Sequence, residues 1–177
     1  MHPILDKGPC NEGQSGPVFF LGGKACASND TTCNASKAVR NCTIPAGKGI
    51  FFPIVNSEDS DAEEASFGTT PLPTINQLRQ IVEGGTNSAA GLEVDLDGKS
   101  IKDLATAFRV TSVDFEYTAP ANNELEALGE NVPAGTYSPA VDDGIYVMLK
   151  PLSPGAHLLH LRAPSQIPVS RSTSSIT

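Results

Sequence analysis

The stretch Gly49-Ile50-Phe51-Phe52-Pro53-Ile54-Val55 is the longest apolar run in this chain of 177 residues. Its side chains are apolar at successive positions rather than at alternate ones, which is typical of a strand buried between two layers. Pro53 has no N–H to donate, so the sequence predicts a bulge or a sheet edge there. The run is far shorter than the ~20 residues that a membrane-spanning helix needs, and we therefore expect no transmembrane segment.

The other strands are predicted by short runs of β-branched and aromatic residues bounded by Gly and Pro. They cover residues 17–21, 92–96, 108–110, 113–117, 144–149 and 156–161. The alternation changes phase between 108–110 and 113–117, which predicts a β-bulge near Ser112. The last two runs are expected to form a hairpin, and residues 119–143 before it are expected to form a long irregular loop.

One helix is expected among these strands. Thr74 and Gln77 match a capping box, and apolar residues repeat at helical spacing over 75–82. Gly84 and Gly85 are expected to end the helix, because glycine is favoured just after the last helical turn. The helix is short, so we expect it to pack on a sheet rather than to build a bundle.

These elements predict an all-β protein with one short helix. Strands and helices do not alternate as they do in parallel βαβ folds. The expected architecture is therefore a two-layer antiparallel β-sandwich of the jelly-roll or immunoglobulin-like kind. A single domain is expected over residues 1–163, followed by a polar, Ser/Thr-rich tail over residues 164–177 that is too poor in apolar residues to fold alone.

Cysteines and potential glycan acceptors gather in the first quarter of the chain. The cysteines are Cys10, Cys26, Cys33 and Cys42, and the Asn-x-Ser/Thr sequons begin at Asn29, Asn34 and Asn41. An even cysteine count beside sequons predicts disulfides, N-glycosylation and an extracellular location. We favour the pairs Cys10–Cys42 and Cys26–Cys33, because nested closure leaves the intervening loop free. The spacing lacks Cys-x-x-Cys and no histidine lies nearby, so a zinc site is disfavoured.

The alternative of a cytosolic protein with four free thiols and chance sequons stays open. The chain starts at Met1-His2-Pro3 without a recognisable leader, so the secreted interpretation implies that a leader was removed or left out. The net charge of −8 disfavours nucleic acid as a partner, because phosphates require clustered Lys and Arg side chains.

Four motifs support a family resemblance. Residues 13–21 read Gly-Gln-Ser-Gly-Pro-Val-Phe-Phe-Leu, and residues 42–53 start with a cysteine and contain Pro-Ala-Gly-Lys-Gly-Ile-Phe-Phe-Pro. A Leu-Asp-Gly-Lys turn follows at 96–99, and Pro-Leu-Ser-Pro-Gly-Ala-His lies at 151–157. Together they resemble a group of uncharacterised secreted bacterial and archaeal proteins. The resemblance implies secretion and a β-rich domain, and it implies no particular activity.

Acidic residues just after the apolar run are the candidate metal ligands. The candidate ligands for calcium are Asn56, Glu58, Asp59 and Asp61. Ca²⁺ takes about six to eight oxygen ligands, which an acidic loop can supply. The alternative is a solvated acidic loop without a metal. Calcium is the only cofactor that the sequence suggests.

No catalytic residue is assigned from the sequence, which leans against an enzyme. The segment Gly13-Gln14-Ser15-Gly16 departs from the Gly-x-Ser-x-Gly nucleophile elbow, because its second glycine comes one position early. His157 and His160 are three residues apart on a predicted strand, so they are expected to face opposite sides. Two carboxylates could act as a glycosidase pair, but nothing in the sequence selects them.

The leading functional hypothesis is a secreted, disulfide-stabilised and N-glycosylated module with a structural or adhesive role at the cell surface. It includes assembly into a homo-oligomer or surface polymer by strand addition at a sheet edge. A carbohydrate-binding or calcium-dependent binding module is the first alternative, with glycans as partners. A carboxylate-based glycoside hydrolase or lyase is the second alternative.

Overall fold

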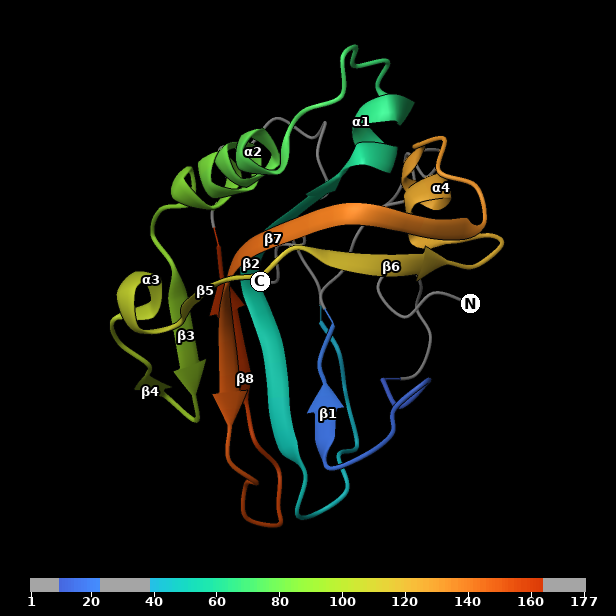
Figure 1. The fold of residues 1–177 in the computed structure, drawn as a ribbon. Coiled ribbons are helices and arrows are strands. Elements are labelled where there is room, and N and C mark those ends of the chain that lie inside the picture. The colour runs from blue at the N-terminus through green and yellow to red at the C-terminus, as the bar shows by residue number, and fades with distance from the viewer. Residues whose placement is uncertain (1–9, 23–38, 164–177) are drawn as a thin grey trace.

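The computed structural model describes residues 10–22 and 39–163, which Figure 1 shows in colour. The strands are β1 (Val18–Phe20), β2 (Gly49–Ser60), β3 (Glu93–Leu96), β4 (Lys99–Ser100), β5 (Arg109–Thr111), β6 (Phe115–Ala119), β7 (Gly135–Leu149) and β8 (Leu159–Arg162). The helices are α1 (Asp61–Ser66), α2 (Ile75–Asn87), α3 (Leu104–Ala107) and α4 (Glu124–Leu128). The described part of the chain is therefore rich in β-structure, as the sequence predicts.

The larger sheet is built on the long antiparallel pair β2–β7. Its strand order is β1-β2-β7-β5, and β6 pairs with the earlier part of β7. Strand β1 runs parallel to β2, which corrects the expectation of a purely antiparallel arrangement. The β2–β7 register shifts between Pro53 and Val55. Near Ser112 the sequence predicts a β-bulge, whereas the structure ends β5 at Thr111 and begins β6 at Phe115.

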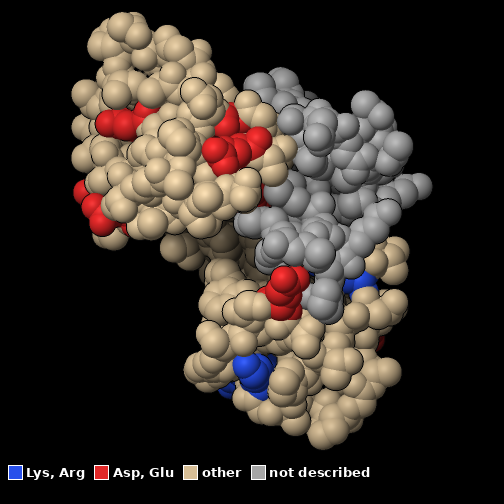
Figure 2. Space-filling model, turned by 90° about the vertical axis from the view of Figure 1, so that its right-hand side faces the viewer, with Lys and Arg blue, Asp and Glu red and all other residues tan. Residues whose placement is uncertain are grey.

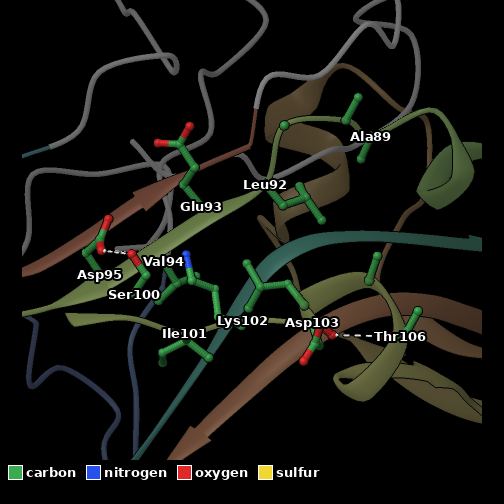
Figure 3. Close-up of a pocket in the computed structure, with 14 residues that line it drawn as sticks. Ala89, Leu92, Glu93, Val94, Asp95, Ser100, Ile101, Lys102, Asp103 and Thr106 are labelled. Atoms are coloured by element: carbon green, nitrogen blue, oxygen red, sulfur yellow. Dashed lines mark hydrogen bonds between the residues drawn. The ribbon is translucent and has the colours of Figure 1, made fainter.

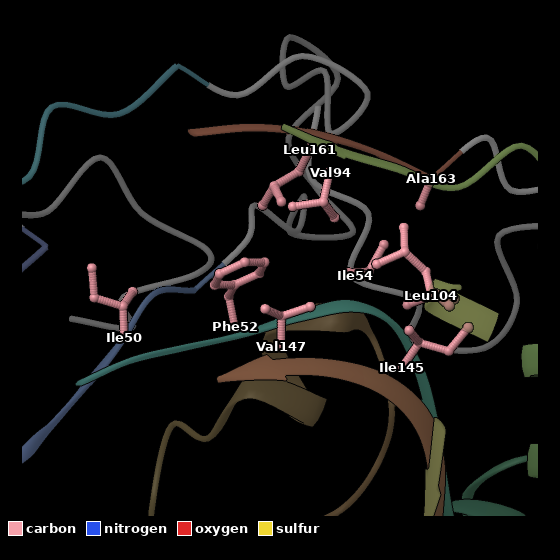
Figure 4. Packing of buried hydrophobic residues seen from close by; sticks show 10 residues of the cluster. Ile50, Phe52, Ile54, Val94, Leu104, Ile145, Val147, Leu161 and Ala163 are labelled. Carbon is pink, nitrogen blue, oxygen red and sulfur yellow. The ribbon is translucent and has the colours of Figure 1, made fainter. Parts of the chain in front are cut away.

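A smaller antiparallel sheet of order β4-β3-β8 packs on one face of the larger sheet, which we call the inner face. Both sheets contribute side chains to one buried hydrophobic cluster (Figure 4). Its members include Phe52 and Ile54 of β2, Val147 of β7, Val94 of β3 and Leu161 of β8. The apolar run at the start of β2 is thus buried between two layers, as its composition predicts.

Helix α2 covers the inner face beside the smaller sheet (Figure 1). Leu78 and Val82 of this helix form a second buried cluster with Val141 of β7. The predicted capping box of Thr74 and Gln77 is present at its start.

The end of α2 differs from the prediction. The helix does not stop at Gly84 and Gly85 but continues to Asn87. Close packing on β2 explains the second glycine, because a Cβ at Gly85 would lie only 2.7 Å from the Ser57 Oγ. Glycine here serves contact between helix and sheet rather than helix termination.

The largest departure from the sequence-based expectation lies in residues 119–143. Instead of an irregular loop they contain α4 and the first part of β7. Thr136, Ser138 and Pro139 give this part of β7 a loop-like composition, and its pairing with β6 orders it. The predicted hairpin of 144–149 and 156–161 is also wrong, because β8 pairs with β3 in the smaller sheet.

The additional helices α1, α3 and α4 correct the expectation of a single helix. They contain only four to six residues each, which is too short for a periodic apolar pattern.

The predicted disulfide between Cys10 and Cys42 is present, with the two Cα atoms 5.4 Å apart. The other predicted pair, Cys26–Cys33, lies outside the described residues, as do the sequons at Asn29 and Asn34 and the tail over 164–177. Within the described ranges, no helix is long and apolar enough to cross a membrane.

Candidate functional site

The first two motifs of the family resemblance bind one another. The side-chain amide of Gln14 engages both polar groups of the Phe20 backbone. Its Oε1 accepts from the N–H at 2.8 Å, and its Nε2 donates to the carbonyl at 2.7 Å. Lys48, from the second motif, donates from Nζ to the Gly16 carbonyl at 2.8 Å. These contacts give the motif residues a structural role.

The other two motifs meet in a similar way. Asp97 of the Leu-Asp-Gly-Lys turn accepts a hydrogen bond from the Leu158 N–H at 2.8 Å and contacts Nδ1 of His157 at 2.7 Å. This contact raises the pKa of His157 and lowers the pKa of Asp97. His157 precedes β8 whereas His160 lies within it. His157, the histidine of the fourth motif, therefore stabilises the loop before β8.

Strand β2 turns directly into helix α1 at Ser60. Ser60 is the N-cap of the helix, and its Oγ accepts from the Glu63 N–H and donates to the Glu63 carboxyl group at 2.8 Å. Residues 58 and 59 lie on opposite faces of the strand, whereas residues 63 and 64 lie together on the first turn of the helix. Two carboxyl pairs therefore form around the cap.

The first pair joins Glu58 and Glu63 by a hydrogen bond between their carboxyl groups. Burial raises the pKa of Glu58 to about 7 and the pKa of Glu63 to about 10, and repulsion from the Glu58 charge adds to the shift at Glu63. Because two adjacent carboxylates cannot both ionise cheaply, the pair holds a proton at neutral pH.

The second pair joins Asp59, which faces inward, to Glu64. Burial raises the pKa of Asp59 to about 8, and the negative charge of Glu64 contributes in the same direction. Thr69 donates from Oγ1 to the Glu64 carboxyl group at 2.6 Å, and the Ser60 N–H donates to Asp59 at 2.9 Å. The junction between β2 and α1 is thus held by two acid pairs.

The opposite side of the larger sheet, which we call the outer face, adds a fifth acid. Asp142 of β7 lies directly across from Glu58. It accepts hydrogen bonds from the Tyr146 hydroxyl and from Nδ2 of Asn56. Burial raises the pKa of Asp142, while these two bonds oppose the shift. Like charges directly opposite each other destabilise a strand pair, so a proton held by this group favours the pairing.

Two further acids come from the segment between β6 and β7. Burial raises the pKa of Glu124 to about 7 and also raises the pKa of Glu130. With them the acidic cluster, as we call it, comprises Glu58, Glu63, Glu124, Glu130 and Asp142. In Figure 2, Asp and Glu gather mainly in the upper part of the view and Lys and Arg below.

An aromatic row crosses the outer face and ends at the acidic cluster. The rings of Phe20 and Phe51 pack edge to face, with their centroids 5.7 Å apart. The rings of Phe51 and Tyr146 stack, with their centroids 5.5 Å apart. The Tyr146 hydroxyl then donates to Asp142. The row thus links strand β1, at one end of the sheet, to the buried acids.

A cavity of about 390 Å³ opens beside the start of this row. Phe20, Phe51 and Pro53 supply much of its apolar wall, and Gln14 and Arg40 are among its polar lining residues. Phe20 is 57% exposed, which is unusual for a phenylalanine in a sheet. The aromatic end of the row is therefore accessible to a ligand.

A larger hollow of about 760 Å³ lies beside β3, β4 and α3 (Figure 3). Two of its polar side chains bond within the wall. Ser100 donates to the Asp95 carboxylate at 2.6 Å, and Thr106 donates to the Asp103 carbonyl at 3.2 Å. This hollow therefore offers fewer unengaged groups to a ligand than its size suggests.

The structure separates the four predicted calcium ligands. Asn56 and Glu58 belong to the outer face, Asp59 faces inward, and Asp61 starts α1. Within residues 10–22 and 39–163, no group of three or more His, Cys, Asp or Glu side chains is arranged to hold a metal ion. Asn41, the sequon asparagine within these ranges, is exposed.

Sequence reasoning treated the acids after the apolar run as one loop and missed their pairing. The signal was the equal spacing of Glu58 to Glu63 and of Asp59 to Glu64, with the N-cap residue Ser60 between them. An N-cap at Ser60 predicts a strand followed directly by a helix, with each acid on the strand five residues before its partner on the helix. The contribution of Asp142 depends on strand register and had no local signal.

No protein-family model matches this sequence, and neither curated proteins nor solved structures give a match. The family resemblance therefore stays a prediction.

Proposed function

We propose that this protein is an extracellular adhesive module that binds a glycan along the outer face of its larger sheet. The Cys10–Cys42 disulfide supports an oxidising compartment, and the exposed sequon at Asn41 is consistent with it. The β-rich fold supports a module that presents one sheet face to a ligand. This function joins the adhesive hypothesis to the carbohydrate-binding one.

The exposed ring of Phe20 beside the 390 Å³ cavity is the observation that carries this proposal. Aromatic side chains supply a large, rigid apolar face, and binding pockets combine such faces with a few polar groups. Along the row, Phe51 and Tyr146 extend the apolar surface to Asn56 and Asp142, which can bond hydroxyl groups. This order of aromatic and polar groups suits a sugar chain.

The directly bonded acids favour binding over glycoside hydrolysis. A hydrogen bond joins the carboxyl groups of Glu58 and Glu63 directly. Retaining glycosidases hold their two carboxyl groups ~5–5.5 Å apart, and inverting enzymes hold them ~6.5–9.5 Å apart. The bonded pair is therefore too close to enclose a glycosidic bond.

Titration calorimetry of the full chain with soluble β-glucan, mannan and chitin oligosaccharides tests the binding proposal. The variant Phe20→Ala should weaken binding about tenfold or more, because the exposed ring is lost. Val113→Ala, at a side chain that is 78% exposed outside the row, is the matched control and should bind as the parent does. Failure of all three sugars to bind, or equal binding by Phe20→Ala, would refute the proposal.

The calorimetry also addresses the calcium-dependent form of the hypothesis. Binding is compared in the presence of Ca²⁺ and of a chelator. Equal affinity in both solutions assigns recognition to the aromatic row, whereas loss of binding on chelation assigns it to a calcium site.

A carboxylate-based glycoside hydrolase or lyase is the second candidate. It is favoured by the position of Glu58 directly across from Asp142 on neighbouring strands. A pKa of about 7 would let Glu58 donate a proton, and the bonds from Tyr146 and Asn56 suit an ionised Asp142. Release of reducing ends from the same sugars, abolished by Glu58→Gln and retained by Val113→Ala, would support it. No release from any of them removes this candidate.

A further inference from the structure

The edge of the larger sheet at β1 is closed by a side chain. Among the described strands, β1 lies at the end of the sheet and pairs with β2. The Pro17 carbonyl and the Leu21 N–H bond to β2. Alternation along the strand therefore turns the N–H and C=O of Phe20 toward the free edge.

Gln14 occupies this edge as a neighbouring strand would. A side-chain amide carries a donor and an acceptor like those of a peptide group, and Gln14 uses both on Phe20, at 2.7 and 2.8 Å. Unpaired strand edges recruit strands from other chains, and proteins commonly block them. Gln14 is such a block, supplied from the turn just before the strand.

The disulfide holds the block in place. Gln14 lies four residues after Cys10, and its Nε2 also donates to the Cys10 carbonyl at 3.3 Å. Cys10 is bonded to Cys42, just ahead of β2, so the start of the turn is fixed to the body of the sheet. Gly13 and Gly16, with φ of +69° and +68°, let the chain turn back so that Gln14 faces Phe20.

We propose that the Cys10–Cys42 disulfide is a latch that keeps Gln14 on the β1 edge, and that its reduction opens this edge to β1 of a second copy of the chain. The reductant is a small dithiol. Its two thiols give two electrons and two protons, the bond between the cysteine sulfurs breaks to yield two thiols, and the reagent closes to its own disulfide.

Strand β1 is self-complementary for such pairing. Two copies of Val18–Phe20 placed antiparallel about Phe19 put Val18 of each copy opposite Phe20 of the other. Both of these residues turn their backbone polar groups to the edge, so a two-fold pair satisfies them reciprocally. The exposed Phe20 rings add apolar contact across the pair.

Amide hydrogen exchange at Phe20 tests the latch directly. Protection of this amide should fall about tenfold or more in Gln14→Ala and in the double variant Cys10→Ser/Cys42→Ser. Ser15→Ala, an exposed position in the same turn, should leave it unchanged. Continued protection of Phe20 in the folded double variant would overturn the latch.

Light scattering after gel filtration, over a hundredfold range of concentration, tests the second half of the proposal. The double variant, Gln14→Ala and the parent treated with dithiothreitol should associate more strongly than the oxidised parent and Ser15→Ala. If the double variant fails to fold, Gln14→Ala, which keeps the disulfide, still tests the edge, and exchange in the reduced parent tests the latch. Loss of Phe20 protection without increased association would overturn pairing between copies.

Discussion

Two buried acidic regions lie at the β2–β7 pair and are neutralised in opposite ways. On the inner face, Asp143 is fully buried and bonds Arg109 at 2.8 Å and the Thr111 hydroxyl at 2.6 Å. Around α1, Glu63 is 3% exposed and bonds another acid, Glu58. A cation balances the first region and a proton balances the second. Burial of acids therefore does not by itself determine how stability responds to pH.

Neighbouring strands explain the difference. Strand β5 pairs with β7 and brings Arg109 beside Asp143. The acidic cluster is instead approached by α1 and by the segment between β6 and β7, which contribute Glu63, Glu124 and Glu130. At Glu58 and Glu63, burial and mutual repulsion favour protonated carboxyl groups.

The largest expected effect comes from removing the charge that Arg109 balances. Asp143→Asn should lower the free energy of unfolding by roughly 3 kcal/mol, because it leaves the guanidinium group and the Thr111 hydroxyl without their anionic partner. Urea denaturation at pH 7 measures the loss. Asp114→Asn, which removes an exposed acid, is the control and should change stability little. Equal stability of the two variants would show that the ion pair contributes nothing net.

Raising the pH should weaken the acid-paired region in the unmodified protein. The pKa values of Glu58, Asp59 and Glu63 are raised to about 7, 8 and 10, from ordinary values of 4.5, 3.8 and 4.5. The folded state therefore binds more protons than the unfolded state. Its stabilisation is complete below about pH 4 and is lost as pH rises through the folded pKa values.

Urea denaturation at pH 5, 7 and 9, at constant ionic strength, checks this direction. We expect the free energy of unfolding to fall by on the order of 2 kcal/mol from pH 5 to pH 9. Stability that stays constant or increases over this range would contradict proton sharing between the acids.

The comparison also shows what the sequence could reveal. The buried run at the start of β2, the capping box of α2 and the Cys10–Cys42 pair are local signals, and each was read correctly. Asp142 and Asp143 fall in the loop expected over residues 119–143, because their place in the middle of β7 depends on pairing with β2, β5 and β6. Composition cannot reveal pairing between segments so far apart.

The candidate site was predictable only in part. The acids near residue 58 were singled out, but as open loop ligands rather than as buried pairs. The aromatic row was not predicted, because Phe20, Phe51 and Tyr146 come from three strands and meet only once the strand order is known. Local sequence supplies the side chains, and register decides which of them meet.

A smaller effect should separate the shared proton from the packing around it. In Glu63→Gln the amide can still accept from Ser60 and donate to Glu58, but it holds no titratable proton. At pH 9 this variant should be more stable than the parent by about 1 kcal/mol, and at pH 5 the two should be nearly equal. Glu126→Gln, at an exposed acid of α4, removes the same charge and should not reproduce the pattern. Equal gains in both variants would assign the effect to net charge.

The smallest expected effect concerns an exposed acid that has a cationic partner. Asp97 contacts His157, which raises the pKa of His157 and lowers the pKa of Asp97. The histidine contribution to stability is present below its unfolded pKa and lost as pH rises through the folded value. The Asp97 contribution is present above its unfolded pKa and lost as pH falls through the folded value.

The variant Asp97→Asn keeps an acceptor for the Leu158 N–H, and asparagine tolerates the positive φ of 53° at this position. The pKa of His157, followed by NMR titration, should fall toward its ordinary value. The free energy of unfolding should change little, because the pair is solvated. Glu93→Gln removes another exposed acid of the smaller sheet and should leave the His157 titration unchanged. A large loss of stability in Asp97→Asn would mean that this exposed contact contributes to folding as strongly as the buried pair of Asp143 and Arg109. A small loss would show that the partner of an acid, a cation or a proton, affects stability strongly only where the acid is buried.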